Sequence, residues 1–307
     1  MTGALARILK EKDIPFAEHA PTAPLSTFRI GGTCRYLVRP RCMGELIEAL
    51  AAIRRGALPF LIVGRGSNLL FEDGEAPVVL LLTTAVNAVR REGEGDFIAD
   101  CGASLGALSL MTARCGFADL GFACGIPGTV GGGVLMNAGA HGNSLGEVVK
   151  SVTALEISTG KITTFFNEQL AFSYRNSLFQ DGKWLILRAR LACRTPVEPA
   201  AALRERRALL TRRAATQPLD LPSAGSAFRR PAEGVALGKI FEELGLKGLA
   251  VGGAMVSKKH AGFIVNTGGA TARDVGTLIT KIQDITEGKC GFRPVPEIQF
   301  ASERVRI

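Results

Sequence analysis

The sequence predicts an α+β protein in which a β-rich part with two glycine-rich loops precedes a smaller α+β part. Three observations support this fold class. The chain has 307 residues, a length that fits two domains or one large one. Short apolar runs typical of strands dominate residues 60–193, whereas the later residues alternate helical patterns with short strands. The turn-rich sequence Thr195-Pro-Val-Glu-Pro separates the strand-rich part from the part that mixes helices and strands.

The β-rich part is expected to begin with a helix and several short strands. Apolar residues recur every three to four positions over residues 44–56, which predicts an amphipathic helix. The apolar run at 60–63 predicts a buried strand that ends at the first glycine-rich loop. Two more strands are predicted at 78–82 and 97–101, and Ser104 is typical of the cap of a following helix.

A hairpin and one long strand complete this part. Residues 148–157 and 162–166 read as strands, and Ser158-Thr-Gly-Lys between them is typical of a turn. Another strand is predicted at 184–193. The glycine-rich stretch 125–142, which precedes the hairpin, is interpreted as a ligand-binding loop, because so many glycines cost backbone entropy unless close approach or unusual backbone angles are needed.

The smaller part is expected to alternate helices and strands. An arginine-rich helix is predicted over 200–216 and a long amphipathic helix over 271–287. The other predicted elements are a helix at 238–244 and short strands at 254–256 and 263–265. The tail from Arg293 is too short for a domain, so we expect it to return to the first part.

Composition excludes several classes of protein. Hydrophobic residues make up 47% of the chain and charged residues 21%, which is typical of globular proteins. The longest apolar run, 76–83, is far shorter than the ~18 residues of a membrane span. No signal peptide is evident at the start, so we expect a cytoplasmic protein without a membrane partner. The seven cysteines are scattered without a Cys-x-x-Cys pair, so we expect reduced thiols and no metal site.

The chain is basic, with 37 Lys and Arg against 28 Asp and Glu, which fits either nucleic acid or anionic metabolites. The basic residues form short pairs, and no known nucleic-acid-binding motif accompanies them. Only Trp184, Tyr36 and Tyr174 stand beside the sixteen Phe, so a platform for stacking bases is not evident. We therefore expect anionic metabolites as ligands and no nucleic-acid partner.

The two glycine-rich loops are the strongest chemical signal in the sequence. Glycine allows close approach of the backbone to a ligand, and successive N–H groups in such loops bind anions. Gly64-Arg-Gly-Ser-Asn follows the predicted strand at 60–63, but Leu69 stands where a Gly-x-Gly-x-x-Gly motif needs its third glycine. For either loop alone, a tight turn is the alternative. Together, each expected after a strand, they predict an elongated ligand with a pyrophosphate.

A series of motifs in order resembles one family. Gly64-Arg-Gly-Ser-Asn-Leu-Leu and Gly125-Ile-Pro-Gly-Thr-Val-Gly-Gly are similar to the FAD-binding loops of the UDP-N-acetylenolpyruvoylglucosamine reductases, also called UDP-N-acetylmuramate dehydrogenases. The resemblance extends over nearly the whole chain. Its further motifs are Thr27-Phe-Arg-Ile-Gly-Gly, Phe172-Ser-Tyr-Arg-Asn-Ser, Pro222-Ser-Ala-Gly-Ser-Ala-Phe, Leu244-Gly-Leu-Lys-Gly, Lys259-His-Ala-Gly-Phe-Ile-Val-Asn and Pro296-Glu.

The resemblance implies an FAD-binding fold of the vanillyl-alcohol-oxidase type, with two α+β subdomains, plus a smaller α+β substrate-binding domain. We expect the FAD-binding region at 1–195, divided into subdomains of roughly 1–57 and 58–195. The substrate-binding domain is expected at 196–293, and the tail 294–307 on the FAD-binding region. In this family NADPH reduces FAD, and UDP-N-acetylglucosamine enolpyruvate is then reduced to UDP-N-acetylmuramate, a precursor of cell-wall peptidoglycan.

Three residues that match family motifs are expected to be catalytic. Hydride addition to the enolpyruvyl C3 places charge on C2 and on the adjoining carboxylate, so a fixed cation and an acid there lower the barrier. The resemblance assigns these roles to Arg175 and Glu297, and proton delivery to C2 to Ser226. Without the resemblance, Arg175 would read as a surface residue, Glu297 as a structural acid and Ser226 as a turn or cap serine.

The remaining candidate residues come from the same motifs. Arg65 and Ser67 stand where relatives of this fold attach flavin to His or Cys, so non-covalent FAD is expected. His141 replaces the aromatic residue usual in the family at this position. Expected FAD contacts are Gly64, Arg65, Gly66, Ser67, Asn68, Leu69, Gly125, Pro127, Gly128, Thr129, Gly131, Gly132, Asn137, Gly139, His141 and Gly142. Expected contacts with the UDP-sugar are Tyr174, Arg230, Lys239 and His260.

Two alternatives remain open from the sequence. A flavin oxidase of the same fold would return electrons to O₂ and would have no use for the set Arg175, Ser226 and Glu297. A basic nucleic-acid- or nucleotide-binding protein without chemistry would be colourless, whereas a flavoprotein is yellow. One branch of the family covers its substrate with a tyrosine on an inserted loop. This chain has only Tyr36 and Tyr174, so it resembles the shorter branch, and we expect a monomer.

Overall fold

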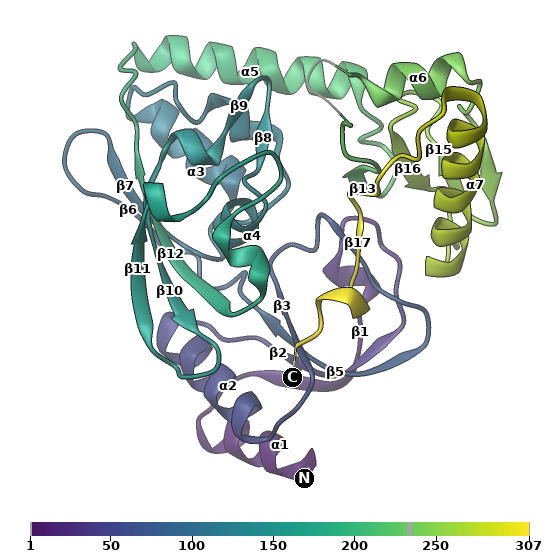
Figure 1. The fold of residues 1–307 in the computed structure, drawn as a ribbon. Coiled ribbons are helices and arrows are strands. Elements are labelled where there is room, and N and C mark those ends of the chain that lie inside the picture. Colours follow the sequence, from purple (N-terminus) through teal and green to yellow (C-terminus); the bar gives the residue numbers. More distant parts are fainter. Residues whose placement is uncertain (1, 232–234, 307) are drawn as a thin grey trace.

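The computed structural model describes residues 2–231 and 235–306, which form three bodies (Figure 1). A cleft lies where these bodies meet. The first body is a four-stranded sheet of order β1-β2-β5-β3, covered by two helices. Strands β2, β5 and β3 are parallel, and β1 is antiparallel to β2. Its elements are α1 (Thr2–Glu11), β1 (Phe16–Pro21), β2 (Thr33–Val38), α2 (Met43–Arg55), β3 (Phe60–Val63) and β5 (Glu75–Leu82).

This sheet is buried on both faces, because alternate side chains of its strands pack into two different cores. Val79 and Leu81 of β5 belong to the core that includes α1 and α2, whereas Leu80 and Leu82 belong to a smaller core on the other face. Successive side chains of a strand point to opposite faces. The run Val78–Leu82 is therefore apolar throughout, which is typical of a strand inside a parallel sheet.

The second body is a five-stranded antiparallel sheet of order β11-β10-β12-β7-β6. It shares one continuous core with the first body, in which Leu46 and Phe60 join Phe97 and Leu105. Two helices and a short strand pair lie beside it. Its elements are β6 (Val89–Arg91), β7 (Asp96–Asp100), α3 (Leu105–Arg114), α4 (Val130–Leu135), β8 (Gly139–Ala140), β9 (Asn143–Ser144), β10 (Val149–Glu156), β11 (Ile162–Phe166) and β12 (Trp184–Ala192).

The third body is a four-stranded sheet of order β13-β16-β15-β14 with two helices. The stripe Val275, Leu278 and Ile282 of the long helix is buried in its core, as the apolar spacing predicts. Phe28 and Ile30, which are distant in sequence, are buried in the same core. Its elements are β13 (Ser223–Ser226), α6 (Leu237–Glu243), β14 (Ala250–Val251), β15 (Ala254–Val256), β16 (Phe263–Asn266) and α7 (Ala272–Cys290).

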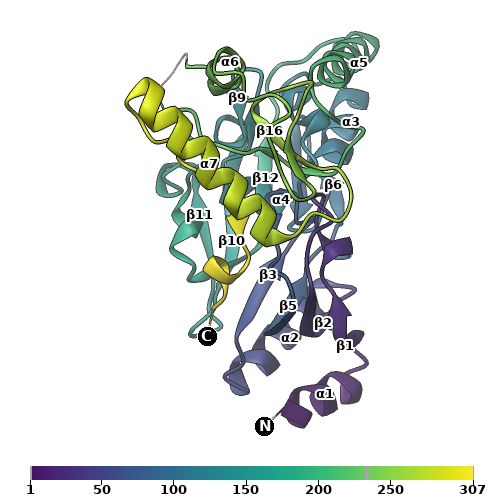
Figure 2. The ribbon, with the colours of Figure 1, turned by 90° about the vertical axis from the view of Figure 1, so that its right-hand side faces the viewer.

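Two segments connect the third body to the other two. Helix α5 (Pro199–Thr216) packs on α3 and runs from the second body towards the third (Figures 1 and 2). After α7 the tail returns, and β17 (Gln299–Phe300) pairs in parallel with β4 (Leu69–Leu70). Phe60 and Arg306 then exchange two backbone hydrogen bonds of 2.8 Å. The tail therefore lies on the first body, while the limits of the domains stay a prediction.

The glycine-rich stretch at 125–142 departs from the expectation. It follows a 3₁₀-helix, Gly121–Gly125, and not a strand, and its residues 130–135 form α4. Glycine disfavours helices, but the Thr129 side chain accepts a hydrogen bond from the Gly132 N–H and Val134 is fully buried. In α4 the Thr129 cap and the packing of Val134 thus outweigh the low helix propensity of glycine. Elsewhere, no helix within 2–231 or 235–306 is long and apolar enough to cross a membrane.

Candidate active site

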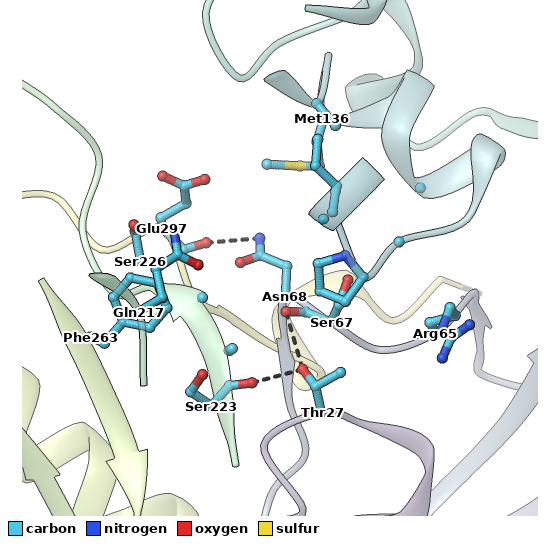
Figure 3. Close-up of a pocket in the computed structure, with 18 of the residues that line it drawn as sticks. Thr27, Arg65, Ser67, Asn68, Met136, Gln217, Ser223, Ser226, Phe263 and Glu297 are labelled. Carbon is cyan, nitrogen blue, oxygen red and sulfur yellow. Dashed lines mark hydrogen bonds between the residues drawn. The ribbon is translucent and has the colours of Figure 1, made fainter. Parts of the chain in front are cut away.

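A cleft of about 1670 Å³ lies where the three bodies meet, and Figure 3 shows its centre. Single drug-sized ligands occupy roughly 300–1,000 Å³, so this cleft has room for a dinucleotide and a second ligand. Both glycine-rich loops line it from one side and the third body lines it from the other. The cleft is lined by all three predicted catalytic residues, Arg175, Ser226 and Glu297. The first and the last of them are 122 positions apart in the sequence.

The two glycine-rich loops touch each other at the cleft. A Cβ on Gly64 would lie 2.5 Å from the Thr129 hydroxyl oxygen, so only glycine allows this approach. Gly66 has φ +58°, and a Cβ there would overlap the carbonyl oxygen of Leu25. Within the described residues, the backbone N–H groups of 65–68, Gly128 and Thr129 donate to no protein acceptor. These donors form a concave site for an anion.

Most of the predicted loop residues line the cleft, but three do not. Residues 64–69, Gly125, Pro127, Gly128, Thr129, Gly132, Gly139 and His141 line it. Gly131 packs away from it, where a Cβ would lie 3.1 Å from the Cys101 Cβ. Asn137 is buried and ties the loop, because its amide donates to the Ser173 carbonyl at 3.0 Å and accepts from the Gly146 N–H at 2.8 Å. Gly142 lies in the turn between β8 and β9.

Arg175 and Glu297 form a close pair in the cleft. The Arg175 Nε donates to the Glu297 Oε1 at 2.6 Å, and their side chains are only 21% and 11% exposed. Burial raises the pKa of the Glu297 carboxyl, and the charge and hydrogen bond of Arg175 oppose that rise. The pair therefore places a fixed cation beside a carboxyl that keeps its proton over a wider pH range than in water.

Backbone contacts from two bodies hold Glu297 in place. Its N–H donates to the Ala227 carbonyl at 2.8 Å, so it lies beside the strand end that carries Ser226. Its carbonyl accepts a hydrogen bond of 3.0 Å from the Asn68 amide (Figure 3). The Gln299 N–H donates to the Asn68 carbonyl at 3.0 Å. The first glycine-rich loop thus fixes the position of this acid.

A β-bulge orients Ser226 into the cleft. Ser223 pairs with Val265 and Ser226 with Phe263, so β13 has one residue more than β16 over the same length. Gly225 absorbs the extra residue with φ +81°. Bulges of this kind redirect a side chain and are common beside active sites. Ser226 is exposed to the cleft, and Figure 3 shows it next to Glu297.

The four expected substrate contacts also line the cleft. The ring of Tyr174 contacts two guanidinium groups, and its centroid lies 5.4 Å from the Cζ of Arg175 and 5.2 Å from the Cζ of Arg230. Its hydroxyl accepts the Arg230 N–H at 3.3 Å. Lys239 is 80% exposed and makes only a loose ion pair, 3.9 Å long, with Glu243.

His260 is the fourth of these residues, and its protonation follows from its contacts. The Nδ1 atom accepts the Gly262 N–H at 3.0 Å, which leaves the proton of the neutral ring on Nε2. Burial lowers the pKa of His260, so the neutral ring persists to lower pH than in water. His260 therefore offers a neutral N–H donor to a ligand.

Known proteins resemble this chain over nearly its whole length. Residues 34–165 match the model of an FAD binding domain, and residues 217–301 that of the C-terminal domain of UDP-N-acetylenolpyruvoylglucosamine reductase. The reductase of that name from Caldanaerobacter subterraneus subsp. tengcongensis is 41% identical over 302 residues, 98% of this chain and 97% of the relative. The chain belongs to the UDP-N-acetylenolpyruvoylglucosamine reductase family.

Other members of the UDP-N-acetylenolpyruvoylglucosamine reductase family agree. The reductase from Carboxydothermus hydrogenoformans is 36% identical over 96% of this chain and 97% of its own. The crystal structure of the reductase from Thermus caldophilus superposes with a TM-score of 0.76 at 29% identity, covering 94% of this chain and 98% of that one. The predicted family, fold class and FAD cofactor are therefore confirmed, and the flavin oxidase alternative is not favoured.

The residues of the cleft fit the FAD of this reductase family. A dinucleotide carries a pyrophosphate, and the free N–H groups at 65–68, Gly128 and Thr129 form a site of the matching charge and shape. Glycines 64 and 66 allow the first loop to pack closely against Thr129 and Leu25, since any Cβ there would meet these protein atoms. A non-covalent attachment stays a prediction.

Two of the cleft residues that the sequence reasoning missed contact the glycine-rich loops of this reductase. Arg213 of α5 packs on loop residue Gly125, where a Cβ would lie 2.6 Å from its Cδ, and burial lowers the pKa of Arg213. Nothing in the charge pattern separates it from its neighbours in α5. Thr27 bonds to both a glycine-rich loop and β13. It lies in the family motif Thr27-Phe-Arg-Ile-Gly-Gly, and this motif was the feature of the sequence that could have marked Thr27 as a site residue.

Proposed function

We propose that this chain reduces UDP-N-acetylglucosamine enolpyruvate to UDP-N-acetylmuramate with electrons from NADPH. The observation that carries the proposal is the Arg175–Glu297 pair of 2.6 Å, which shares a cleft with Ser226 and with the anion site of the glycine-rich loops. An olefin reductase needs a cation, an acid and a proton donor at one place. The family membership of the chain points to the same reaction.

When bound, FAD would supply the redox chemistry, taking two electrons from NADPH and making them available as a hydride for C3 of the enolpyruvyl group. The free N–H groups at 65–68, Gly128 and Thr129 hold its pyrophosphate. Since the first loop has Arg65 and Ser67 where relatives of this fold carry the His or Cys that attaches flavin, the loops bind FAD through hydrogen bonds without a covalent bond. Arg213 adds a positive charge at the same end of the cleft.

Arg175 and Glu297 act on the carboxylate of the substrate. One N–H of Arg175 is held by Glu297, and its Nη atoms remain for the carboxylate, apart from a long contact of Nη1 with the Gly139 carbonyl at 3.4 Å. As charge builds up on C2 and the carboxylate, the guanidinium and the acid form of Glu297, which burial favours, stabilise it more than they stabilise the ground state. The pair thus lowers the barrier to reduction.

Ser226 delivers the proton that completes the reaction. Its hydroxyl is exposed to the cleft at the end of β13, beside Glu297. A serine hydroxyl is a weak acid, but the carbanion-like C2 that forms after hydride arrival is a strong base. Tyr174, Arg230, Lys239 and His260 line the cleft near this strand and bind the UDP-sugar.

We propose that the protein works as a monomer in the cytoplasm. Its partners are then the UDP-sugar and NADPH, with no nucleic acid or membrane. The product serves peptidoglycan synthesis, and hence cell-wall growth and division.

The proposed function is tested by NADPH oxidation with the purified yellow protein. We expect NADPH oxidation to depend on the enolpyruvyl substrate and to yield a product two hydrogens heavier, in a one-to-one ratio. Hydrogen peroxide is measured in parallel without the sugar. Equal NADPH oxidation without the substrate, with matching peroxide, would make the chain an oxidase and refute the proposal.

A further inference from the structure

We propose that Thr27 is a positioning residue for Ser226, because it ties the strand that carries Ser226 to the first glycine-rich loop. The inference rests on the proposed function, in which Ser226 is the proton donor. Thr27 lies between the 3₁₀-helix Ala23–Leu25 and β2, far from Ser226 in sequence. No step of the proposed reaction uses it directly.

The contacts of Thr27 join two bodies of the protein at one point. Its hydroxyl donates to the Ser223 carbonyl at 2.7 Å, and its carbonyl accepts the Ser223 N–H at 3.1 Å. The Ser67 carbonyl lies 3.5 Å from the same hydroxyl, at the outer limit of a hydrogen bond (Figure 3). The Thr27 side chain therefore contacts both the first glycine-rich loop and β13.

The geometry of β13 makes this contact relevant to Ser226. Ser223 begins the strand and Ser226 ends it, and the bulge at Gly225 lies between them. On the other side, Ala227 is held by the Glu297 N–H at 2.8 Å. Ser226, which pairs with Phe263 of β16, thus lies between a contact of Thr27 with Ser223 and a contact of the tail with Ala227. Loss of the Thr27 hydroxyl weakens the first contact and allows the bulge to shift the Ser226 hydroxyl along the cleft.

The rest of the third body does not depend on the Thr27 hydroxyl. Phe28 and Ile30 stay buried in its core, and the Asn266 amide donates to the Phe28 carbonyl at 3.2 Å. Thr27→Val keeps the shape of the side chain and the backbone bond to Ser223 but removes the hydroxyl. We therefore expect this variant to fold, with the lost restraint confined to β13.

Hydrogen exchange on the protein without substrate tests the positional claim. We expect the amides of 222–227 to exchange faster in Thr27→Val than in the wild type, while those of β16 stay unchanged. Thr27→Ser keeps the hydroxyl and should restore slow exchange. Thr22→Val is the matched control, because the Thr22 hydroxyl also donates to a backbone carbonyl, that of Gly32 at 3.2 Å, without contact to β13. Unchanged exchange at 222–227 in Thr27→Val would overturn the inference.

Rapid mixing tests the functional claim. With NADPH-reduced enzyme, we expect Thr27→Val to slow flavin reoxidation by the enolpyruvyl substrate about 10- to 100-fold with little change in substrate affinity, since a misplacement of about 1 Å costs up to ~100-fold. The solvent deuterium isotope effect on this step should rise, because proton delivery becomes limiting. A loss of affinity alone would assign Thr27 to substrate binding and overturn the inference.

The double variant separates the two hypotheses. If Thr27 acts through Ser226, Thr27→Val should add no further slowing to Ser226→Ala. Independent, multiplying effects would overturn the inference. Normal reoxidation in Ser226→Ala alone would instead refute the donor assignment of the proposed function, while the exchange data would still decide whether Thr27 holds β13.

Discussion

Replacement of Gly66 by alanine should weaken FAD binding by far more than it disturbs the rest of the fold. Gly66 has φ +58°, a conformation that costs an alanine about 1–2 kcal/mol. The new Cβ would also lie 2.9 Å from the Ser26 Cα and overlap the Leu25 carbonyl, and such overpacking costs about 1–3 kcal/mol. If the FAD-binding conformation of the loop bears about 2–4 kcal/mol of this strain, its affinity falls roughly 30- to 700-fold.

The assay is titration of the apoprotein with FAD, followed by quenching of flavin fluorescence, beside thermal unfolding. Gly74→Ala is the matched control, because Gly74 also has positive φ, +83°, but a Cβ there meets nothing within 4 Å. It should lose about 1 kcal/mol of stability and bind FAD normally. Wild-type affinity in Gly66→Ala would show that this loop does not hold the cofactor, and would refute the reasoning.

Three further predictions concern the second loop and the Arg175–Glu297 pair. Gly128→Val should lower the flavin content, because Gly128 lines the cleft. Gly131→Val should instead lower the melting temperature, because an added Cβ alone would lie 3.1 Å from the Cys101 Cβ. The reverse pattern would contradict the loop placement. Arg175→Gln should raise the pKa of Glu297 further, since burial raises it and Arg175 opposes the rise. Stability contributed by this carboxyl is lost as the pH rises through its folded pKa. The fall in unfolding free energy should therefore extend to higher pH in Arg175→Gln than in the wild type, and an unshifted curve would contradict it. Glu297→Gln should slow substrate reduction much more than flavin reduction by NADPH, and equal effects on both steps in rapid mixing would remove Glu297 from the mechanism.

Elements with a clear apolar period were predictable from the sequence, and elements stabilised by distant contacts were not. The strands at 60–63 and 162–166 and the helix at 200–216 lie within a residue of their predicted limits. Helix α4 was not predicted, because its glycines hide a helix that depends on the Thr129 cap and on burial of Val134. Strand β17 has two residues and exists only because β4 pairs with it.

In the candidate site too, residues in sequence motifs were predictable, whereas roles that depend on distant contacts were not. The motifs predicted Arg175, Ser226 and Glu297 together, and the structure brings all three to one cleft. The sequence could not show that Asn137 would tie backbone segments instead of lining the cleft, since its hydrogen bonds reach 36 residues along the chain. Nor could it show that Thr27 would bond Ser223, a contact across 196 residues. Such pairings are set by the packing of whole bodies, which no local pattern encodes.

The two half-reactions of Ser226→Ala test the central claim most directly. Rapid mixing with NADPH should bleach the flavin of this variant at the wild-type rate, because no proton is delivered to C2 in that step. Addition of the enolpyruvyl substrate should then restore the flavin about 10²- to 10⁴-fold more slowly, the usual worth of a general acid. Ser226→Cys, which keeps a proton donor at nearly the same place, should recover part of the rate. Equal slowing of both steps, or slowing of neither, would contradict the assignment of Ser226 as the proton donor of an olefin reductase.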